Sequence, residues 1–374
     1  AYERYVNDDQ GNMKLETNLL AGSDIDLYIS HGLPRLQKRA GGMALQLDDL
    51  CKRDGFDPQA EMGDLYTSTL VDGKLYAIPT VNALYGIVIN KDMFDEVGIP
   101  IPTHWTLDEF REIAKQLTHG ESTDKVYGMF FNTQQDMTYP FQFFSSQILG
   151  KTIYYNDDLT ATNFAAEANI KAVQTMTDMM LVDQSAPTHS DSFTQKLSQE
   201  GMFLTEKCAM TIGPWMVRSI KDTTNYPHDF VTAFAPYPVP FKQDEYYAQG
   251  GAGDFLSINP NSKNIDAAWE FIKWYSRGGM LPLVGGGRVP LNVNIDTDDV
   301  LDAYIAGAED LLDAQTTKEV LLAPRSNYAV EVVSDQHPEI LKVLNQHLEA
   351  IYLGTEDVTE GLQAAQNEAN GLLK

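Results

Sequence analysis

The residue types best suited to hold a ligand follow an apolar segment in the second half of the chain. Residues 209–212 have the composition of a buried strand, and Gly213, Pro214 and Trp215 come directly after it. Glycine permits an unusual turn, and proline suits the first turn of a helix. Ligands bind at such strand-to-helix junctions of α/β sheets, and a flat aromatic ring offers an apolar face to the C–H groups of a sugar. Trp215 therefore either stacks on a ligand or packs between a helix and the sheet.

Polar side chains that can bind hydroxyl groups accompany two other extended segments. His31 follows residues 25–30, which alternate like a strand, and its imidazole can donate and accept hydrogen bonds. Asn82 and Tyr85 lie beside a second extended segment. An amide can bond two hydroxyl groups at once, and a tyrosine brings a ring and a donor. The alternatives are a surface position for His31 and hinge packing for Asn82 and Tyr85.

Two glycine-rich runs add further candidates. In residues 250–254 the glycines, Gly251 among them, permit close approach of a ligand to the backbone, and Asp254 can accept hydrogen bonds from hydroxyl groups. This run is not a phosphate loop, because it lacks the following Lys-Ser/Thr pair and the strand–loop–helix context. In residues 285–290, Arg288 can bind a hydroxyl pair or a carboxylate with its planar fork, or it can pair with a surface acid.

The other aromatic residues divide between cleft candidates and the core. Tyr139 follows a polar loop at 132–136 and Tyr328 follows Arg-Ser-Asn, so both are candidates to line a cleft, with core packing as the alternative. Trp105 directly precedes a capping box and is expected to act as a hydrophobic staple. We expect core packing for four other aromatic residues, which are Phe143, Phe144, Trp269 and Trp274.

Neither a metal site nor a cofactor site is indicated by the sequence. The acids at 296–299 lack the glycine and terminal glutamate of a calcium loop, and acids suit the start of a helix. There is no nucleophile elbow and no HExxH motif, and the seven histidines show no ligand spacing. Cys51 and Cys208 are expected to be two lone buried thiols, although a disulfide between them stays open. We therefore expect no cofactor and no metal.

Length and charge limit the class of protein. A chain of 374 residues is too long for one ordinary core, so we expect two domains. The formal net charge of −26 disfavours nucleic acid as a partner, because there is no basic stripe to release counterions from phosphates. No run approaches the roughly 18 apolar residues that a membrane-spanning helix needs.

Strand-like and helix-like segments alternate along the chain, which predicts an α/β fold with mostly parallel sheets. There is no low-complexity linker, so we expect the chain to cross between its domains more than once, at 78–82, 246–251 and 310–316. Strands are predicted at 25–30, 73–79, 85–90, 125–131, 209–212 and 255–258. Helices are predicted at 13–20, 91–97, 106–117, 163–182, 193–201 and 266–276, and over most of the chain after residue 300.

Four segments resemble, in order and spacing, the extracellular solute-binding proteins of ABC importers, in the carbohydrate-binding family that includes maltose-binding protein. They are residues 18–28 (NLLAGSDIDLY), 76–79 with 85–94 (YAIP and YGIVINKDMF), 210–215 (MTIGPW) and 261–272 (NSKNIDAAWEFI). The last helix, 361–370, also resembles the end of the family, and the resemblance covers nearly the whole chain.

The resemblance implies a two-lobed clamshell with a hinge of crossing strands and a ligand cleft between the lobes. The first lobe is expected to hold residues 1–81 and 249–312, and the second lobe residues 82–248 and 313–374. Trp215 matches the family's stacking tryptophan, whereas Ala252 stands where the family often has a large residue. We do not find the family's first strand in residues 1–12, so we expect about 30–50 further residues before this sequence.

The function that the resemblance implies is capture of a sugar or oligosaccharide and its delivery to a membrane permease by hinge closure. It further implies a monomer, a place in the periplasm or on the outer face of the membrane, and attachment by a lipid anchor. Two alternatives stay open at this point. A glycoside hydrolase needs two facing carboxylates, which 53 acids do not exclude, and the solute can also be a polyamine or a metal complex.

Overall fold

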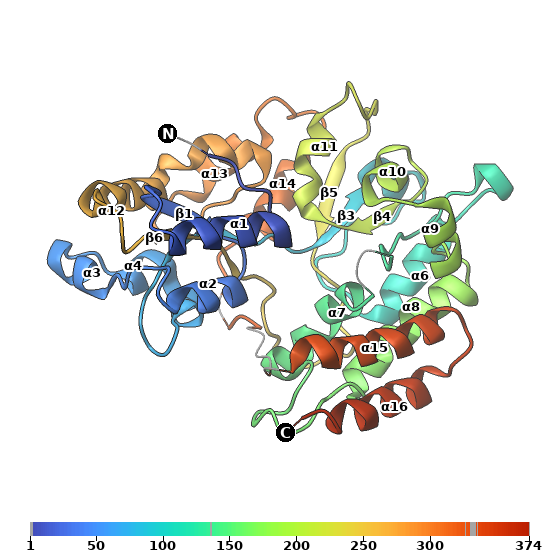
Figure 1. Cartoon of the computed structure of the whole chain (residues 1–374). Helices are drawn as coiled ribbons and strands as arrows, with labels where there is room; N and C mark the ends of the chain where they lie inside the picture. The colour runs from blue at the N-terminus through green and yellow to red at the C-terminus, as the bar shows by residue number, and fades with distance from the viewer. Residues whose placement is uncertain (1–2, 135–136, 326, 330–333, 335, 374) are drawn as a thin grey trace. The chain divides into compact units, whose positions relative to one another are not determined.

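The structure of the protein is a computed structural model that describes residues 3–134, 137–325, 327–329, 334 and 336–373 (Figure 1). Its internal contacts divide the chain into two compact units. Unit 1 holds residues 1–83 and 250–304, and unit 2 holds residues 84–249 and 305–374. The chain therefore passes three times from one unit to the other, and the third passage comes earlier than the expected boundary at 312. That these units are the lobes of a clamshell stays a prediction.

Unit 1 is built on a three-stranded sheet in the order β1-β6-β2. The strands are β1 (Leu27–Ser30), β2 (Ile78–Asn82) and β6 (Ala252–Ile258). The central strand β6 pairs with both neighbours in antiparallel fashion, so that Leu256 lies opposite both Ile29 and Ile78. The other elements of the unit are α1 (Asp9–Leu20), α2 (Leu33–Ala40), α3 (Asp48–Asp54), α4 (Pro58–Met62), η1 (Gly63–Thr69), α12 (Ile265–Trp274), η5 (Tyr275–Gly279), η6 (Leu281–Gly286) and α13 (Thr297–Ile305), whose last residue belongs to unit 2.

A buried ion pair joins the helices of unit 1 to its sheet. Arg39, on α2, is fully buried, and its Nε donates to Glu16 on α1 over 3.3 Å. The guanidinium also donates to Ser30 Oγ at the end of β1, over 2.9 Å, and to Asn12 Oδ1, over 2.7 Å. Buried charges are tolerated when they are paired and hydrogen-bonded, so this network holds α1, α2 and β1 in one arrangement.

Unit 2 is built on a second three-stranded sheet, in the order β4-β3-β5. Its strands are β3 (Ile87–Asn90), β4 (Met210–Ile212) and β5 (Thr232–Ala235), and both pairs are again antiparallel. All residues of the three strands are buried, because helices and loops of the unit cover the sheet. This position explains why the strands consist almost wholly of apolar residues.

The helices of unit 2 supply most of its core. The expected capping box is confirmed: Thr106 accepts from the backbone of Glu109, whose carboxylate accepts from the backbone of Thr106, at the start of α6 (Leu107–Leu117). The last two helices, α15 (His337–Tyr352) and α16 (Val358–Asn370), lie side by side (Figure 1). The other elements are α5 (Lys91–Glu96), η2 (Ser122–Asp124), α7 (Tyr139–Leu149), η3 (Gly150–Thr152), α8 (Glu167–Leu181), α9 (His189–Gln195), α10 (Gln199–Leu204), η4 (Pro214–Met216), α11 (Val217–Lys221), α14 (Ala314–Thr316) and η7 (Thr317–Leu322).

The expectation of mostly parallel sheets is wrong for the strands that the structure describes. The reason is the path of the chain between the units. β2 leads out of unit 1, and β6 comes just after the chain returns, so the two strands lie side by side in opposite directions. In unit 2, β3 follows the entry at residue 84 and pairs with β5, which precedes the exit. Parallel contacts among the described residues occur as single bridges, such as Phe130 with Thr211.

Three predicted elements differ from those in the structure. The strand predicted at 73–79 begins only at Ile78, because positive φ angles at Asp72 and Gly73 make a tight turn there. Residues 125–131 form isolated bridges instead of a strand. The helix predicted at 193–201 is divided, because Lys196 adopts a φ of 52° and Ser198 caps a new helix.

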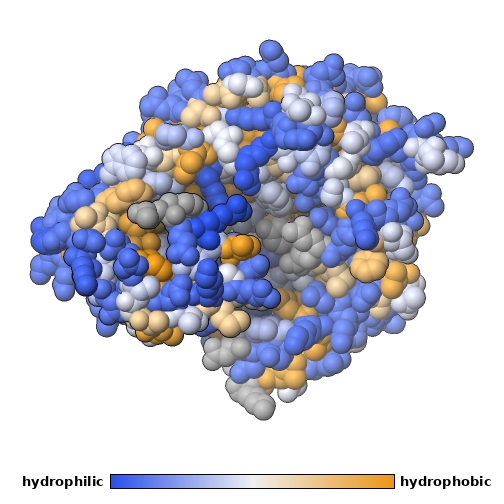
Figure 2. Space-filling model, turned by 45° about the horizontal axis from the view of Figure 1, so that its top comes forward, coloured by the Kyte–Doolittle hydropathy of each residue, from blue (hydrophilic) through white to orange (hydrophobic). Residues whose placement is uncertain are grey.

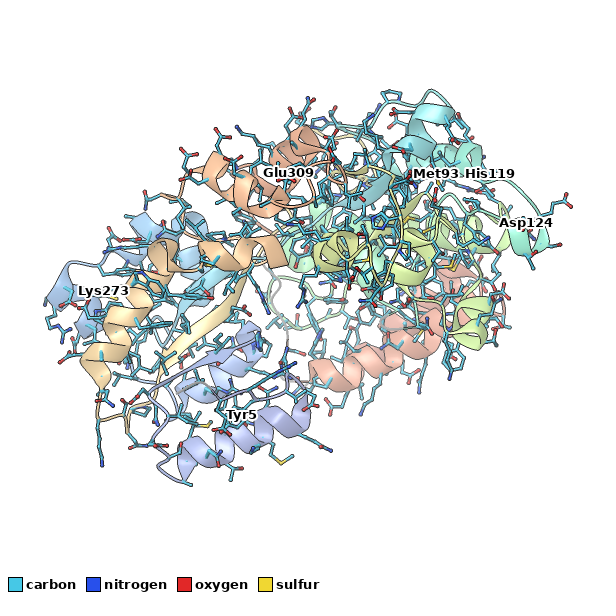
Figure 3. All side chains as sticks on the ribbon, turned by 90° about the horizontal axis from the view of Figure 1, so that it is seen from above. Tyr5, Met93, His119, Asp124, Lys273 and Glu309 are labelled. Carbon is cyan, nitrogen blue, oxygen red and sulfur yellow. The ribbon has the colours of Figure 1, made fainter. Side chains whose placement is uncertain are left out.

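The two tryptophans of α12 have different environments. Trp269 is fully buried, as expected, but Trp274 is 59% exposed, so its assignment to the core is wrong. Five residues turn a helix through about 500°, which places the two rings about 140° apart around its axis. A single narrow buried face of α12 therefore cannot cover both rings. The same helix carries Lys273, labelled in Figure 3, whose ammonium group lies 2.7 Å from Asp54 Oδ2.

The surface of the molecule is mostly polar. Figure 2 shows hydrophilic residues over most of the visible face, with apolar residues scattered among them. Within the described ranges, no helix combines the length and the apolar character that a membrane crossing needs. In the same part of the chain, no three His, Cys, Asp or Glu side chains are grouped as metal ligands would be.

Both cysteines are expected to resist thiol reagents in the native protein. Cys51 and Cys208 are free and buried, which confirms the expectation of two lone thiols. Burial raises the pKa of Cys51 to about 12, with a further contribution from Asp48, and burial also raises the pKa of Cys208. Since the thiolate is the reactive form, a chromogenic disulfide reagent should release colour only after denaturant is added. A fast reaction of either thiol in the native protein would contradict this burial.

Candidate functional site

Three of the predicted site residues form one hydrogen-bonded cluster in unit 1. The His31 Nδ1 atom lies 2.7 Å from Asp254 Oδ1, and Arg288 Nη1 donates to Asp254 Oδ2 over 2.6 Å. The side chain of Asp254 is only 11% exposed, whereas those of His31 and Arg288 are 33% and 47% exposed. Each carboxylate oxygen of Asp254 thus has a partner. Those partners, His31 and Arg288, are more exposed than Asp254, so their side chains are the ones that solvent reaches. Asp254 is better placed to orient His31 and Arg288 than to contact a ligand itself.

The backbone explains how these three residues meet. His31 follows β1, and Gly32, with a φ of 85°, turns the chain into α2. Asp254 lies within β6 but has a φ of 48°, a left-handed conformation that Asp tolerates better than most residues. Its carbonyl oxygen accepts from Thr80 Oγ1 over 2.9 Å. Arg288 lies on a segment that runs beside β2, where Leu291 N donates to the Thr80 carbonyl over 3.0 Å.

Asn82 and Gly251 lie further along the same pair of strands. Asn82 is opposite Ala252 in the register of β2 and β6, and its backbone N donates to the Val289 carbonyl over 2.9 Å. Its side-chain Oδ1 atom is buried and, within the described part of the chain, has no hydrogen-bond partner. A side chain added at Gly251 would meet nothing within 4 Å, so packing does not explain the glycine there. A buried acceptor without a partner is costly, which makes Asn82 a candidate to receive a ligand donor.

Tyr275 is a neighbour of this cluster that the sequence did not single out. Burial raises the pKa of its phenol, the charge of Asp254 raises it further, and Arg288 opposes the change. Tyr275 lies near the end of the predicted helix 266–276, where nothing in the sequence distinguishes it from the other residues of that helix. Tyr275 is the first residue of η5, which packs against β2, the neighbour of β6 in the sheet, so no sequence signal could have identified it.

In unit 2 the turn predicted at Gly213-Pro214-Trp215 is confirmed. Gly213 has a φ of 138°, and Pro214 opens the short helix η4. The indole of Trp215 lies against the Gly213 backbone, because a Cβ atom there would approach its ring to 3.3 Å. Trp215 is 39% exposed, so packing between helix and sheet leaves part of its ring accessible.

Two amide side chains accompany this turn. Gln199 donates through Nε2 to the Ile212 carbonyl over 2.5 Å, and its Oε1 accepts from Asn132 Nδ2 over 3.4 Å. Neither residue was named as a candidate by sequence reasoning, although Asn132 begins the polar loop noted there. The exposed ring offers an apolar face to a ligand, and the buried amide of Gln199, bonded at both ends, holds the end of β4 just before the turn.

The last three predicted site residues are Tyr85, Tyr328 and Tyr139. Tyr85 is half-buried, and its ring meets Phe143 edge-on at 5.2 Å, so it contributes to packing in unit 2. Tyr328 forms a parallel bridge with Ala248. Tyr139 opens α7, but its side chain lies outside the described part of the structure. Phe143 and Phe144 are buried in the core, as expected.

Similar proteins are found both by sequence and by structure. A protein of Brucella abortus (strain 2308), described only as a binding protein, is 25% identical over 369 residues, covering 96% of this chain and 82% of its own. A sugar transporter structure from Rhizobium etli, in an open conformation, matches with a TM-score of 0.80 at 22% identity, covering 100% of this chain and 92% of that one. An ABC substrate-binding protein of Listeria monocytogenes in complex with cycloalternan matches with a TM-score of 0.75 at 19% identity, covering 98% and 89%.

These structural matches show that the chain has the α/β fold of periplasmic binding proteins. The profile of the family described as "Bacterial extracellular solute-binding protein" matches residues 4–277, which is well over half of the chain. The chain therefore belongs to the bacterial extracellular solute-binding proteins, so it acts as a transport receptor outside the cytoplasm and is not an enzyme.

Proposed function

We propose that the protein is the solute-binding component of an ABC importer and that its solute is a sugar or an oligosaccharide. The observation that carries the proposal is the exposed Trp215 ring on a Gly-Pro turn, next to the amides of Gln199 and Asn132. Two structural relatives support it, since one is a sugar transporter and the other holds cycloalternan. Family membership argues against the glycoside hydrolase alternative.

In this proposal the two units act as the lobes of a clamshell. Trp215 and its amides are the contribution of unit 2, and His31, Arg288 and Asn82 are the contribution of unit 1, with Asp254 as a positioning residue. A ligand that touches both units favours the closed form over the open one, and the closed form is the one that a membrane permease recognises. A lipid anchor and a monomeric state belong to the same proposal.

Replacing Trp215 with alanine is expected to abolish most of the ligand-induced stabilisation. At a hundredfold excess over its dissociation constant, a sugar should stabilise the wild-type protein by roughly 2.7 kcal/mol, which a thermal-shift screen of mono- and oligosaccharides detects. Loss of a stacked ring should weaken binding about thirtyfold, because a buried aromatic anchor contributes about 2 kcal/mol. At the same sugar concentration this removes roughly two thirds of the stabilisation.

The matched control is Trp274→Ala, which removes a tryptophan of unit 1 that is 59% exposed, compared with 39% for Trp215. It should retain the full ligand-induced shift. Normal sugar binding by Trp215→Ala would refute the assignment of this ring. Absence of a shift with every sugar, together with a shift by a polyamine or a metal chelate, would overturn the sugar class.

A further inference from the structure

Unit 2 contains a cavity of about 690 Å³ that is separate from the Trp215 turn. Every residue that lines it belongs to unit 2, and of the candidate sugar-site residues only Tyr85 is among them. Its walls are rich in aromatic side chains, including Tyr85, Trp105, Tyr237 and Tyr247. The volume lies in the range of about 300–1,000 Å³ that is usual for small-molecule sites.

The wall of this cavity is held by hydrogen bonds that its own elements supply. Trp105 Nε1 donates to the Pro236 carbonyl over 2.7 Å, which fixes the segment after β5 against the start of α6. Gln147, on α7, donates to the Pro238 carbonyl over 3.0 Å, and its own carbonyl accepts from Tyr247 N over 2.9 Å. The segment 236–247, which lines the cavity, is therefore anchored near its start by Trp105 and at its end by Gln147. The cavity is thus largely formed before any ligand binds.

Arg325 brings a cation into this lining that, among the described residues, has no carboxylate partner. Its guanidinium donates to the Gln249 carbonyl over 2.6 Å and to the Val320 carbonyl. A guanidinium has five N–H donors, so the bonds to two carbonyls leave further N–H groups that a ligand acceptor can use. Among the described residues, none of the ion pairs includes Arg325. Burial lowers the pKa of this group, while Tyr328 and Tyr237 act in the opposite direction, so the guanidinium is partly shielded from water.

The acids that line the cavity already have partners of their own. Glu109 accepts from the backbone and the side chain of Thr106 in the capping box, and it lies 3.6 Å from Lys242. Glu319 accepts from Gln315 over 3.2 Å. Arg325 is thus the lining charge that most needs an anion, and a carboxylate is the group whose geometry matches its planar fork.

We propose that this cavity is a second binding site, specific for a small organic carboxylate whose ring or short apolar part packs against the tyrosines. The carboxylate pairs with Arg325, and the aromatic walls of Tyr237 and Tyr247 cover the apolar part. This site is independent of the sugar site proposed above.

Benzoate and benzamide are the probes for this site, because they share ring and size and differ in charge. Calorimetric titration of the full chain, without sugar, should detect benzoate and give at least tenfold weaker binding of benzamide. Arg325→Gln should lose benzoate binding at least tenfold, and Arg325→Lys, which keeps the charge without the fork, should lose less. Arg218→Gln, which removes an exposed arginine from the same unit, is the matched control and should bind as wild type.

Arg325 also holds two loop carbonyls, so circular dichroism must verify that its variants fold. Val320→Trp adds bulk to the lining and keeps the Arg325 side chain, and it should weaken benzoate binding at least tenfold in a folded protein. Equal affinity for benzoate and benzamide, no measurable benzoate binding, or full benzoate binding by folded Arg325→Gln or Val320→Trp would each overturn the proposal. Because no sugar is present, these outcomes do not depend on whether the protein binds sugars.

Discussion

Replacing Trp269 with alanine is expected to destabilise the protein by about 3–5 kcal/mol, the usual cost of removing a fully buried aromatic side chain. Trp269 is fully buried on α12, and its ring meets Phe56 edge-on at 5.3 Å. Its indole Nε1 also donates to Asp54 Oδ2 over 2.9 Å, which ties α12 to α3. Loss of the ring therefore opens a cavity and removes a hydrogen bond between two helices. Urea unfolding followed by circular dichroism measures the effect.

The matched control lies on the same helix. Trp274→Ala removes an identical side chain that is 59% exposed, and it should change the free energy of unfolding by about 0.5 kcal/mol or less. An equal loss of unfolding free energy in Trp269→Ala and Trp274→Ala would show that the buried and exposed faces of α12 are assigned wrongly.

Replacing Glu16 with glutamine is expected to cost about 3–5 kcal/mol, because it leaves the charge of Arg39 buried without its carboxylate. Arg39 is fully buried, and Glu16 is its only carboxylate partner among the described residues. Glutamine keeps the shape and one acceptor, so the loss reports the charge and not a cavity. An exposed pair gives the control: Asp266→Asn removes one of the two carboxylate partners of Arg53, Asp54 being the other, and should cost about 1 kcal/mol or less.

The difference in unfolding free energy between the wild type and Glu16→Gln is expected to depend on pH, because it depends on the pKa of Glu16. Burial alone would raise that pKa, but the hydrogen bond and charge of Lys38 and the charge of Arg39 outweigh it and hold the pKa below its ordinary value. A carboxylate whose pKa is lower in the folded state stabilises the protein above the unfolded pKa of about 4.3. This contribution is lost as the pH falls through the folded pKa. The stability gap between the wild type and Glu16→Gln should therefore shrink in acid, and a gap that stays constant would mean that the carboxylate is not ionised in the native protein.

Short-range features of the sequence predicted short-range features of the structure. The capping box at Thr106 and Glu109, the turn at Gly213-Pro214 and the helices of the C-terminal part all depend on neighbouring residues, and all were found. The same is true of the two buried thiols, since cysteines without metal or redox spacing are ordinary core residues.

Errors appeared where distant residues decide the outcome. Trp269 and Trp274 have similar neighbours in sequence, yet the elements that pack on α12 bury one face and leave the other to solvent. The alternation of strands and helices predicted parallel neighbours, but the partner of β2 is β6, about 170 residues later, and it enters from the other direction.

The sequence by itself determined the class of fold, the kinds of side chain that can bind a sugar and the turn that exposes Trp215, because each follows from residue type, local spacing or family resemblance. Only the tertiary structure decided that His31, Asp254 and Arg288 form one cluster, that Tyr275 lies near it, and that Arg325 lines an aromatic cavity. Within the cluster alone, His31 and Arg288 come from segments about 260 positions apart. Their meeting depends on which strands pair and where the chain re-enters each unit, and no local pattern encodes either.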